Sequence, residues 1–383
     1  MKYTKVHIDA FGYELPPVVV TTSELEDRLA PMYEALRISK GQLELITGIS
    51  ERRWWTPGYS VSRGAIAAGR KALTAATVRP EDIGMLVYGS VCREHFEPAT
   101  ACRVAAGLGI GGRATVYDIT NACLAAVNGL VDIANRIELG QIRAGMVVAC
   151  ETAREINETM IDRMLEKPDM EVFTKSLATL TGGSGAVAVI VTDGSFSSLK
   201  RRRLLGGAAR AAPEHHDLCV WGLQPNGTQP PGRNVAQPPP AVAVAPSRNP
   251  AQPPPSVAAA PSRMRTFTPF TRTDSAAVLK HGVELGAATW RDFLDTMQWR
   301  TEDVDKIICH QVGSGHQETI LKSIGVPAEK DFPTYPFLGN IGTVSLPLSA
   351  AIAEEREFLR AGDRVAFLGI GSGLNCLMLG LEW

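Results

Sequence analysis

Short apolar segments alternate with helical patterns along most of the chain, and this alternation restricts the possible fold more than any other feature. In the first part, apolar runs typical of strands lie near residues 6–11, 83–88, 115–119, 146–150 and 186–191. Helical patterns lie between these runs, near residues 23–36, 60–75, 99–108 and 124–139. Strands that alternate with helices predict layers of mixed α/β structure with largely parallel sheets.

The second part of the chain repeats this plan. Strands are predicted near residues 203–208, 306–310, 332–335, 364–368 and 375–381, and helices near residues 276–297, 317–324 and 345–359. With 383 residues and 45% hydrophobic content, the chain can bury a large core. Two similar halves predict a site where their strand ends and helix N-termini meet.

One segment, residues 224–263, fits neither half because it is rich in Pro, Ala and Gln. It contains AQPPPAVAVAPSR at 236–248 and AQPPPSVAAAPSR at 251–263, which are identical at 11 of 13 positions. Proline runs lack amide donors, so we expect a solvated polyproline-like insert. It is either a surface loop without a catalytic part or a ligand for a proline-recognition domain.

The insert sets the expected domain organisation. We predict an N-terminal half over 1–195, the start of a C-terminal half over 196–223, the insert over 224–263, and the rest of the C-terminal half over 264–383.

Composition excludes several classes of protein. The 39 Lys and Arg residues balance 40 Asp and Glu residues, which argues against a nucleic-acid-binding protein. The seven cysteines form no CxxC pair, so we expect neither a disulfide framework nor a metal site, and we expect a reducing cytoplasm. The chain has no apolar run of 18 or more residues and begins without an apolar signal segment, so we expect no membrane span and no signal peptide.

Cys123 lies where an apolar strand ends and a helix is predicted to begin. A helix N-terminus has unpaired N–H groups and a partial positive charge, which stabilise a thiolate. We therefore expect the pKa of Cys123 to fall below the ordinary value of about 8.5, which would suit an acyl acceptor. The alternative is a cysteine that only packs in the core.

Two polar residues of the second half are candidates for the same site. His310 ends the apolar strand Lys306-Ile-Ile-Cys-His310, and Asn340 lies beside a glycine before a predicted helix. A histidine at this strand end should face the same seam as Cys123. The alternatives are a hydrogen-bonded core histidine and an asparagine that only serves a turn or helix cap.

Four motifs together resemble the thiolase superfamily, and within it the β-ketoacyl-ACP synthase III group. They are Asn-Ala-Cys123-Leu-Ala, Ile-Cys-His310-Gln-Val, Gly-Asn340-Ile-Gly and Gly369-Ile-Gly-Ser-Gly373-Leu-Asn-Cys. The resemblance implies duplicated βαβαβαββ halves in a five-layer αβαβα sandwich. It also implies that Cys123, His310 and Asn340 are catalytic and that the backbone N–H groups of Cys123 and Gly373 form an oxyanion hole.

A fifth motif is similar to one subfamily, the bacterial acyl-CoA condensing enzymes of head-to-head olefin biosynthesis. Their glutamate lies in a Glu-Pro-[Ser/Ala]-Thr run, as Glu97-Pro-Ala-Thr does here, 26 residues before Cys123. The resemblance implies a homodimer in which Glu97 acts as a base in the partner's site. The alternative for Glu97 is an acid that favours the start of a helix.

These features predict an acyltransferase that joins two fatty acyl-CoAs by Claisen condensation through an acyl-Cys123 intermediate. One alternative is a synthase III that condenses acyl-CoA with malonyl-ACP by decarboxylation, which needs no base such as Glu97. Another is a non-condensing relative that only binds or transfers acyl groups. CoA or phosphopantetheine thioesters would be the substrates, acyl carrier protein a possible partner, and no permanent cofactor, metal or nucleic acid is expected.

Overall fold

The computed structural model describes residues 1–196, 202–225 and 267–383. Of the Pro-rich insert predicted over 224–263, only residues 224 and 225 fall in these ranges, so both repeats lie outside the described residues. The chain divides into a large unit, Met1–Val220 with Thr271–Trp383, and a small unit, Trp221–Phe270. The division into halves at residue 195 remains a prediction, because both halves belong to the large unit.

A nine-stranded mixed sheet runs through the large unit in the order β11-β12-β13-β8-β1-β7-β6-β4-β5. Its strands are β1 (His7–Glu14), β4 (Met85–Gly89), β5 (Thr115–Ile119), β6 (Ala144–Glu151), β7 (Gly185–Thr192), β8 (Arg203–Ala211), β11 (Lys306–Cys309), β12 (Arg364–Gly371) and β13 (Asn375–Glu382). β1 and β8 meet at the pair His7–Arg203. The sheet therefore consists of two parts, one from each half of the chain.

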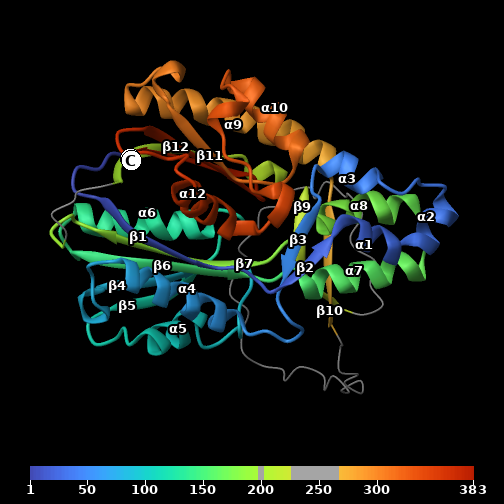
Figure 1. The fold of residues 1–383 in the computed structure, drawn as a ribbon, viewed down its shortest axis with the longest axis horizontal. Helices are drawn as coiled ribbons and strands as arrows, with labels where there is room; N and C mark the ends of the chain where they lie inside the picture. Colours follow the sequence, from blue (N-terminus) through green and yellow to red (C-terminus); the bar gives the residue numbers. More distant parts are fainter. Residues whose placement is uncertain (197–201, 226–266) are drawn as a thin grey trace, which may run out of the picture. The chain divides into compact units, whose positions relative to one another are not determined.

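Helices form three layers around these two parts of the sheet (Figure 1). The outer helices are α4 (Val61–Ala75) and α5 (Thr100–Leu108) on the first part, and α9 (Ser275–Met297) and α10 (Ser314–Ile324) on the second. α6 (Ala125–Glu138) and α12 (Ser345–Glu355) lie between the two parts. α12 is buried from residue 345 to residue 353, as a helix between two sheets must be. The αβαβα order confirms the predicted thiolase-like sandwich.

The prediction of largely parallel sheets is wrong. Parallel pairing occurs between β4 and β5, β4 and β6, and β11 and β12. The other neighbours, such as β6 with β7 and β12 with β13, are antiparallel. β12 and β13 are joined by residues 372–374 alone, and so short a connection permits only antiparallel pairing.

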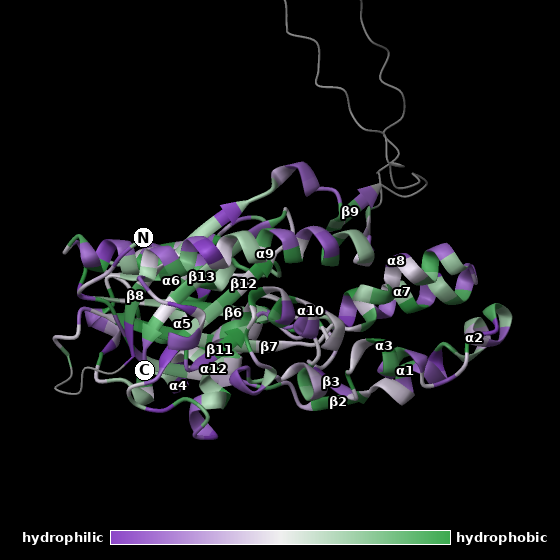
Figure 2. Cartoon of the chain, turned by 90° about the horizontal axis from the view of Figure 1, so that it is seen from above, coloured by the Kyte–Doolittle hydropathy of each residue, from purple (hydrophilic) through white to green (hydrophobic). Residues whose placement is uncertain are grey.

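A group of short helices extends the first half beyond the layers. It comprises α1 (Thr22–Arg28), α2 (Ala30–Leu36), α3 (Gln42–Thr47), α7 (Arg154–Glu166) and α8 (Met170–Leu180). α7 and α8 alternate hydrophilic and hydrophobic residues, whereas the central strands are hydrophobic along most of their length (Figure 2). The apolar side of α7 contributes Ile156, Met160 and Met164 to a separate core with α1 and α2.

Two predicted elements differ from the structure because of proline. The helix expected over 23–36 is two helices, since Pro31 lies in the first turn of α2 and cannot continue the hydrogen bonds of α1. The strand expected over 332–335 is absent. Pro333 and Pro336 lack amide donors, and the segment instead leads into the short helix α11 (Tyr335–Leu338).

Two small sheets complete the described structure. β2 (Val18–Thr21) pairs with β3 (Glu51–Trp54), and β9 (Cys219–Pro225) pairs with β10 (Phe267–Thr273). Among the helices in the described ranges, none combines the length and apolar character needed to cross a bilayer.

Candidate active site

A cavity of about 400 Å³ in the large unit is lined by Cys123, His310 and Asn340. Its walls are mostly apolar and include Ile46 of α3, Leu177 of α8, Val278, Leu279 and Val283 of α9, Ile320 of α10 and Ile370 of β12. The fold thus brings together three polar residues that are far apart in the sequence. A mostly apolar cavity with a few polar groups suits a long apolar ligand with a reactive end.

Cys123 lies in the connection between β5 and α6. The helix begins at Ala125, one residue after the start predicted at 124, and Ala122 has a left-handed φ of +46°. The turn is closed by the N–H of Leu124, which donates to the carbonyl of Asn121 at 2.9 Å. Cys123 is therefore presented just before the helix rather than in its first turn.

The prediction that the pKa of Cys123 falls below its ordinary value is wrong. Burial, with smaller contributions from Cys219 and Glu151, raises the pKa of this thiol to about 12, although a backbone hydrogen bond opposes the rise. A helix dipole contributes about 0.3–1 kcal/mol, and one pKa unit corresponds to about 1.4 kcal/mol, so the helix start cannot offset this burial. The thiol is therefore neutral at pH 7.

His310 follows β11, and its N–H donates to the carbonyl of Leu368 in β12 at 2.8 Å. Burial, with a smaller contribution from His316, lowers the pKa of His310 to about 4, so its ring is neutral at pH 7. Among the described residues, nothing hydrogen-bonds to its buried Nδ1 atom. A neutral imidazole can donate a proton from one nitrogen and accept one at the other.

His316, in the first turn of α10, also lines the cavity and was not singled out in the sequence. Burial lowers its pKa as well, so the cavity contains two neutral imidazoles. The available signal was its place in a Gly-Ser-Gly-His run directly after the His310 motif.

The backbone of Asn340 is held on both sides by one segment of the first half. Its N–H donates to the carbonyl of Thr181 at 2.8 Å, and its carbonyl accepts from the N–H of Gly183 at 2.9 Å. Its side-chain Oδ1 accepts from the N–H of Gly342 at 3.0 Å. This bond leaves the Nδ2 group as the donor of the side chain, which suits an oxygen that gains negative charge.

Glu97 does not line the cavity of its own chain. It is exposed in the loop between β4 and α5, beside Phe96, which is 93% exposed. The start of this loop is fixed, because the buried Glu151 carboxylate accepts from the N–H groups of Val91 at 2.9 Å and Cys92 at 3.1 Å. The loop thus has a rigid base and a tip that faces outward.

The end of the same loop is fixed by Asp118 of β5. Its carboxylate accepts from the N–H groups of Thr100 at 2.9 Å and Ala101 at 2.8 Å, which are the first residues of α5. Asp118 therefore caps this helix from another strand.

Gly373 lies in the turn between β12 and β13 but is not among the residues that line the cavity, whereas its neighbour Ser372 is. The turn passes close to the nucleophile, since a Cβ atom on Gly371 would lie 3.4 Å from the Cys123 nitrogen. The predicted oxyanion role of Gly373 remains a prediction.

The apolar wall formed by α9 was also missed in the sequence. Gly282 and Gly286 are four residues apart and so share a helix face, where a Cβ atom on Gly286 would lie 2.7 Å from Cδ1 of Ile320. Small residues at this spacing indicated a close approach. In the described part of the chain, no group of three or more His, Cys, Asp and Glu residues could hold a metal ion.

Comparisons with known proteins agree with this site. Residues 294–383 match the family model of the 3-oxoacyl-[acyl-carrier-protein] synthase III C terminal. The chain is 50% identical to an acyl-CoA:acyl-CoA alkyltransferase of Shewanella oneidensis over 100% of both chains. It is 33% identical to the Xanthomonas campestris protein of the same name over 98% of this chain and 96% of that protein.

Solved structures of related enzymes are also similar to this chain over its whole length. A crystal structure of a variant of Xanthomonas campestris OleA matches with a TM-score of 0.85 at 31% identity, over 100% of this chain and 98% of that one. Another variant of that protein was crystallised with bound lauric acid and lauroyl-CoA, and it matches with a TM-score of 0.83 at 31% identity over 100% of both chains. The present chain therefore belongs to the acyl-CoA:acyl-CoA alkyltransferase family of thiolase-fold condensing enzymes.

Proposed function

We propose that this protein condenses two fatty acyl-CoAs to a β-keto product through an acyl thioester on Cys123. The observation that carries the proposal is the single cavity in which Cys123, His310 and Asn340 meet apolar walls. The names of the relatives support acyl-CoA as the substrate class. No permanently bound cofactor is needed, and a reducing cytoplasm suits an enzyme with seven free cysteines.

The first step transfers an acyl group from CoA to Cys123. A new C–S bond forms to Cys123 while the C–S bond to CoA breaks, and the thiol proton passes to the departing CoA sulfur. The neutral ring of His310 can carry this proton because it accepts at one nitrogen and donates at the other. This route requires no preformed thiolate, in keeping with the raised pKa of Cys123.

The second step forms the carbon–carbon bond. Glu97 of the partner subunit removes a proton from the α-carbon of the second acyl-CoA, and the carbanion equivalent attacks the acyl carbonyl. The C–S bond to Cys123 breaks, the sulfur takes up one proton, and Glu97 releases the one that it removed, so that the cycle closes without a net change in protons. His310 and the Nδ2 group of Asn340 stabilise the enolate oxygen by donating hydrogen bonds to it. The exposed tip of the Glu97 loop supports action in a neighbouring subunit.

Backbone donors are needed for the oxyanion that forms at the acyl carbonyl. One is the N–H of Cys123. For the second, the sequence motif favours Gly373, whereas the cavity lining favours the adjacent Ser372. Losing one such donor typically slows the reaction about 10²- to 10³-fold.

A decarboxylative condensation with malonyl-ACP is the second candidate. It is favoured by the synthase III match at residues 294–383 and by 26% identity to a β-ketoacyl-ACP synthase III of Roseiflexus castenholzii, over 98% of this chain and 97% of that protein. It would leave Glu97 without a function.

One assay separates these functions. The pure protein is given two long-chain acyl-CoAs without malonyl-ACP, and free CoA and β-keto product are measured. Product that is lost in Glu97→Ala, with acylation of Cys123 retained, supports the Claisen reaction. Product only with malonyl-ACP would favour the synthase, and acylation without product under either condition would indicate a non-condensing relative.

Mixing subunits tests whether Glu97 acts across a dimer. Cys123→Ala and Glu97→Ala proteins should each be inactive as homodimers. After subunit exchange, half of the dimers are mixed and each has one complete site, so about a quarter of wild-type activity should return. If activity does not return although mixed dimers form, Glu97 does not serve the partner's site.

A further inference from the structure

The backbone segment that holds Asn340 has two different edges. Leu180 is the last residue of α8, and Thr181 follows it with helical backbone angles, so the chain leaves the helix at this point. The carbonyl of Thr181 and the N–H of Gly183 face Asn340. The carbonyls of Leu180 and Gly182 do not bond to Asn340 and need hydrogen-bond donors from elsewhere.

Two side chains of β3 supply those donors instead. The Nη2 atom of Arg52 donates to the carbonyl of Leu180 at 3.2 Å, and the Nε1 atom of Trp54 donates to the carbonyl of Gly182 at 3.0 Å. Arg52 and Trp54 are two residues apart, so they share one face of β3 and reach alternate carbonyls. Both side chains are buried, at 0% and 1% exposure.

Residues 180–183 pack directly against residues 338–340, so a displacement of the first segment displaces Asn340. A Cβ atom on Gly183 would lie 1.9 Å from the carbonyl oxygen of Leu338, and one on Gly339 would lie 2.5 Å from that of Thr181. The two backbones therefore touch directly, without side chains between them. Close-packed contacts of this kind transmit displacements rather than absorb them.

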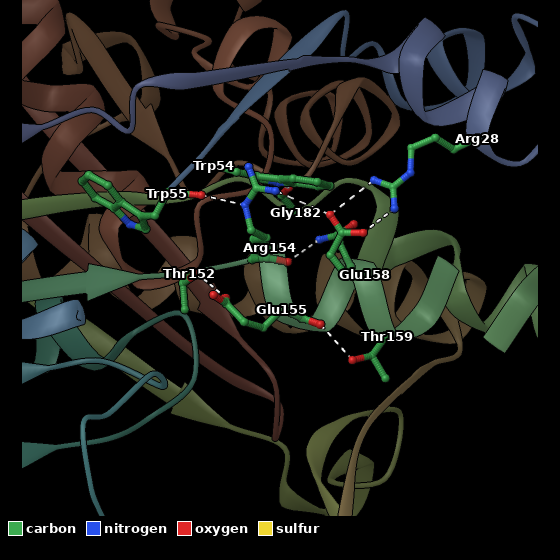
Figure 3. A network of polar contacts seen from close by, with 11 residues as sticks. Arg28, Trp54, Trp55, Thr152, Arg154, Glu155, Glu158, Thr159 and Gly182 are labelled. Carbon is green, nitrogen blue, oxygen red and sulfur yellow. Dashed lines mark hydrogen bonds and ion pairs between the residues drawn. The ribbon is translucent and has the colours of Figure 1, made fainter. Parts of the chain in front are cut away.

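Trp54 is itself fixed by α7, as Figure 3 shows. The guanidinium of Arg154 lies 5.3 Å from the ring centre of Trp54, and its Nε atom donates to the carbonyl of Trp55 at 2.6 Å. Glu158, one turn further along α7, pairs with Arg154 at 3.6 Å and also with Arg28 of α1. The indole is held in one orientation by charged groups that lie outside the cavity.

We propose that Trp54 is a positioning residue for Asn340, which it orients through the hydrogen bond to Gly182. Arg52 performs the same function at the carbonyl of Leu180, two residues earlier. The inference rests on the proposed role of Asn340 in the condensation step. It identifies β3, which contributes no residue to the cavity lining, as a determinant of that step rather than of acyl transfer.

Trp54→Phe tests the proposal because it keeps an aromatic ring and removes only the indole donor. We expect normal acylation of Cys123 by acyl-CoA but about tenfold slower condensation, since a small misplacement of a reacting group has a large effect on rate. Trp290→Phe is the matched control. Trp290 is 3% exposed and donates to Oγ1 of Thr301 at 3.3 Å, away from Asn340. The Trp290→Phe protein should be less stable than the wild type, but its ratio of condensation rate to acylation rate should be unchanged.

The double variant Trp54→Phe/Asn340→Ala separates positioning from general destabilisation. If Trp54 acts through Asn340, the double variant condenses no more slowly than Asn340→Ala alone. Additive losses, or equal losses in acylation and condensation, would overturn the proposal. If Asn340→Ala alone condenses at the wild-type rate, the proposed catalytic role of Asn340 is wrong. That outcome is measured on Asn340→Ala and is independent of the result for Trp54→Phe.

Discussion

The neutral state of His310 makes stability depend on pH in a predictable direction. The folded protein holds the pKa of His310 at about 4 through burial, against an ordinary value of 6.5 in the unfolded chain. Below pH 6.5 the unfolded chain therefore binds a proton that the folded protein does not. The free energy of unfolding should fall as the pH drops from 6.5 towards 4, and this decrease should stop below pH 4.

The size of the effect follows from these two values. At pH 5 the unfolded ring is mostly protonated and the folded ring mostly neutral, which gives a loss of about 2 kcal/mol relative to high pH. Because His310 is not fully buried, screening by solvent reduces this loss to about 1 kcal/mol. The lowered pKa of His316 makes stability change in the same direction. His316 is present in both the wild type and the His310→Asn variant, so its contribution cancels when their stabilities are compared.

Urea denaturation of the wild type and His310→Asn at pH 7, 6 and 5 measures the effect. The wild type should lose about 1 kcal/mol relative to the variant between pH 7 and pH 5. His95→Asn, which removes an exposed histidine, is the control for losing an imidazole at the surface. A stability difference between wild type and His310→Asn that is the same at all three pH values would refute the reasoning.

Two further pairs of substitutions test the close packing beside Asn340 and the cap of α5. Gly183→Ala places a Cβ atom 1.9 Å from the carbonyl oxygen of Leu338 and should destabilise the protein by at least about 2 kcal/mol in thermal or urea unfolding. Gly111→Ala, whose Cβ atom meets nothing within 4 Å, should change stability by less than about 0.5 kcal/mol, and equal losses would contradict this packing. Asp118→Ala removes the acceptor for two N–H groups of α5 and should cost about 1–2 kcal/mol. Asp118→Asn, which keeps one oxygen acceptor, should lose less, and identical losses would contradict the capping role.

Much of the fold could be predicted because the strands of the sandwich are short and apolar. The runs near 146–150 and 186–191 correspond to β6 and β7, which are buried along their whole length. The helical pattern near 124–139 corresponds to α6, with Ala125 as its first residue. The meeting of Cys123 and His310 followed from the pattern of strand ends, whereas Asn340 was expected there from the resemblance of its motif, and all three line one cavity.

What could not be predicted depends on tertiary packing. α7 buries only one side in the core that it shares with α1 and α2, and its largely polar sequence therefore does not stand out as a helix. The breaks at Pro31 and Pro333 were visible in the sequence but were given too little weight. The pKa of Cys123 was misjudged because a local helix effect was counted without the larger desolvation by the cavity.

The most direct test of the account is to locate the acyl group after reaction with one acyl-CoA. The Glu97→Ala protein is incubated with lauroyl-CoA, and intact mass followed by peptide mapping identifies the acylated residue. Mapping is needed because Cys219, Cys309 and Cys376 line the same cavity. We predict one lauroyl group on the peptide that contains Cys123, and none in Cys123→Ala. A lauroyl group on another cysteine, or no adduct on the Glu97→Ala protein, would contradict the mechanism.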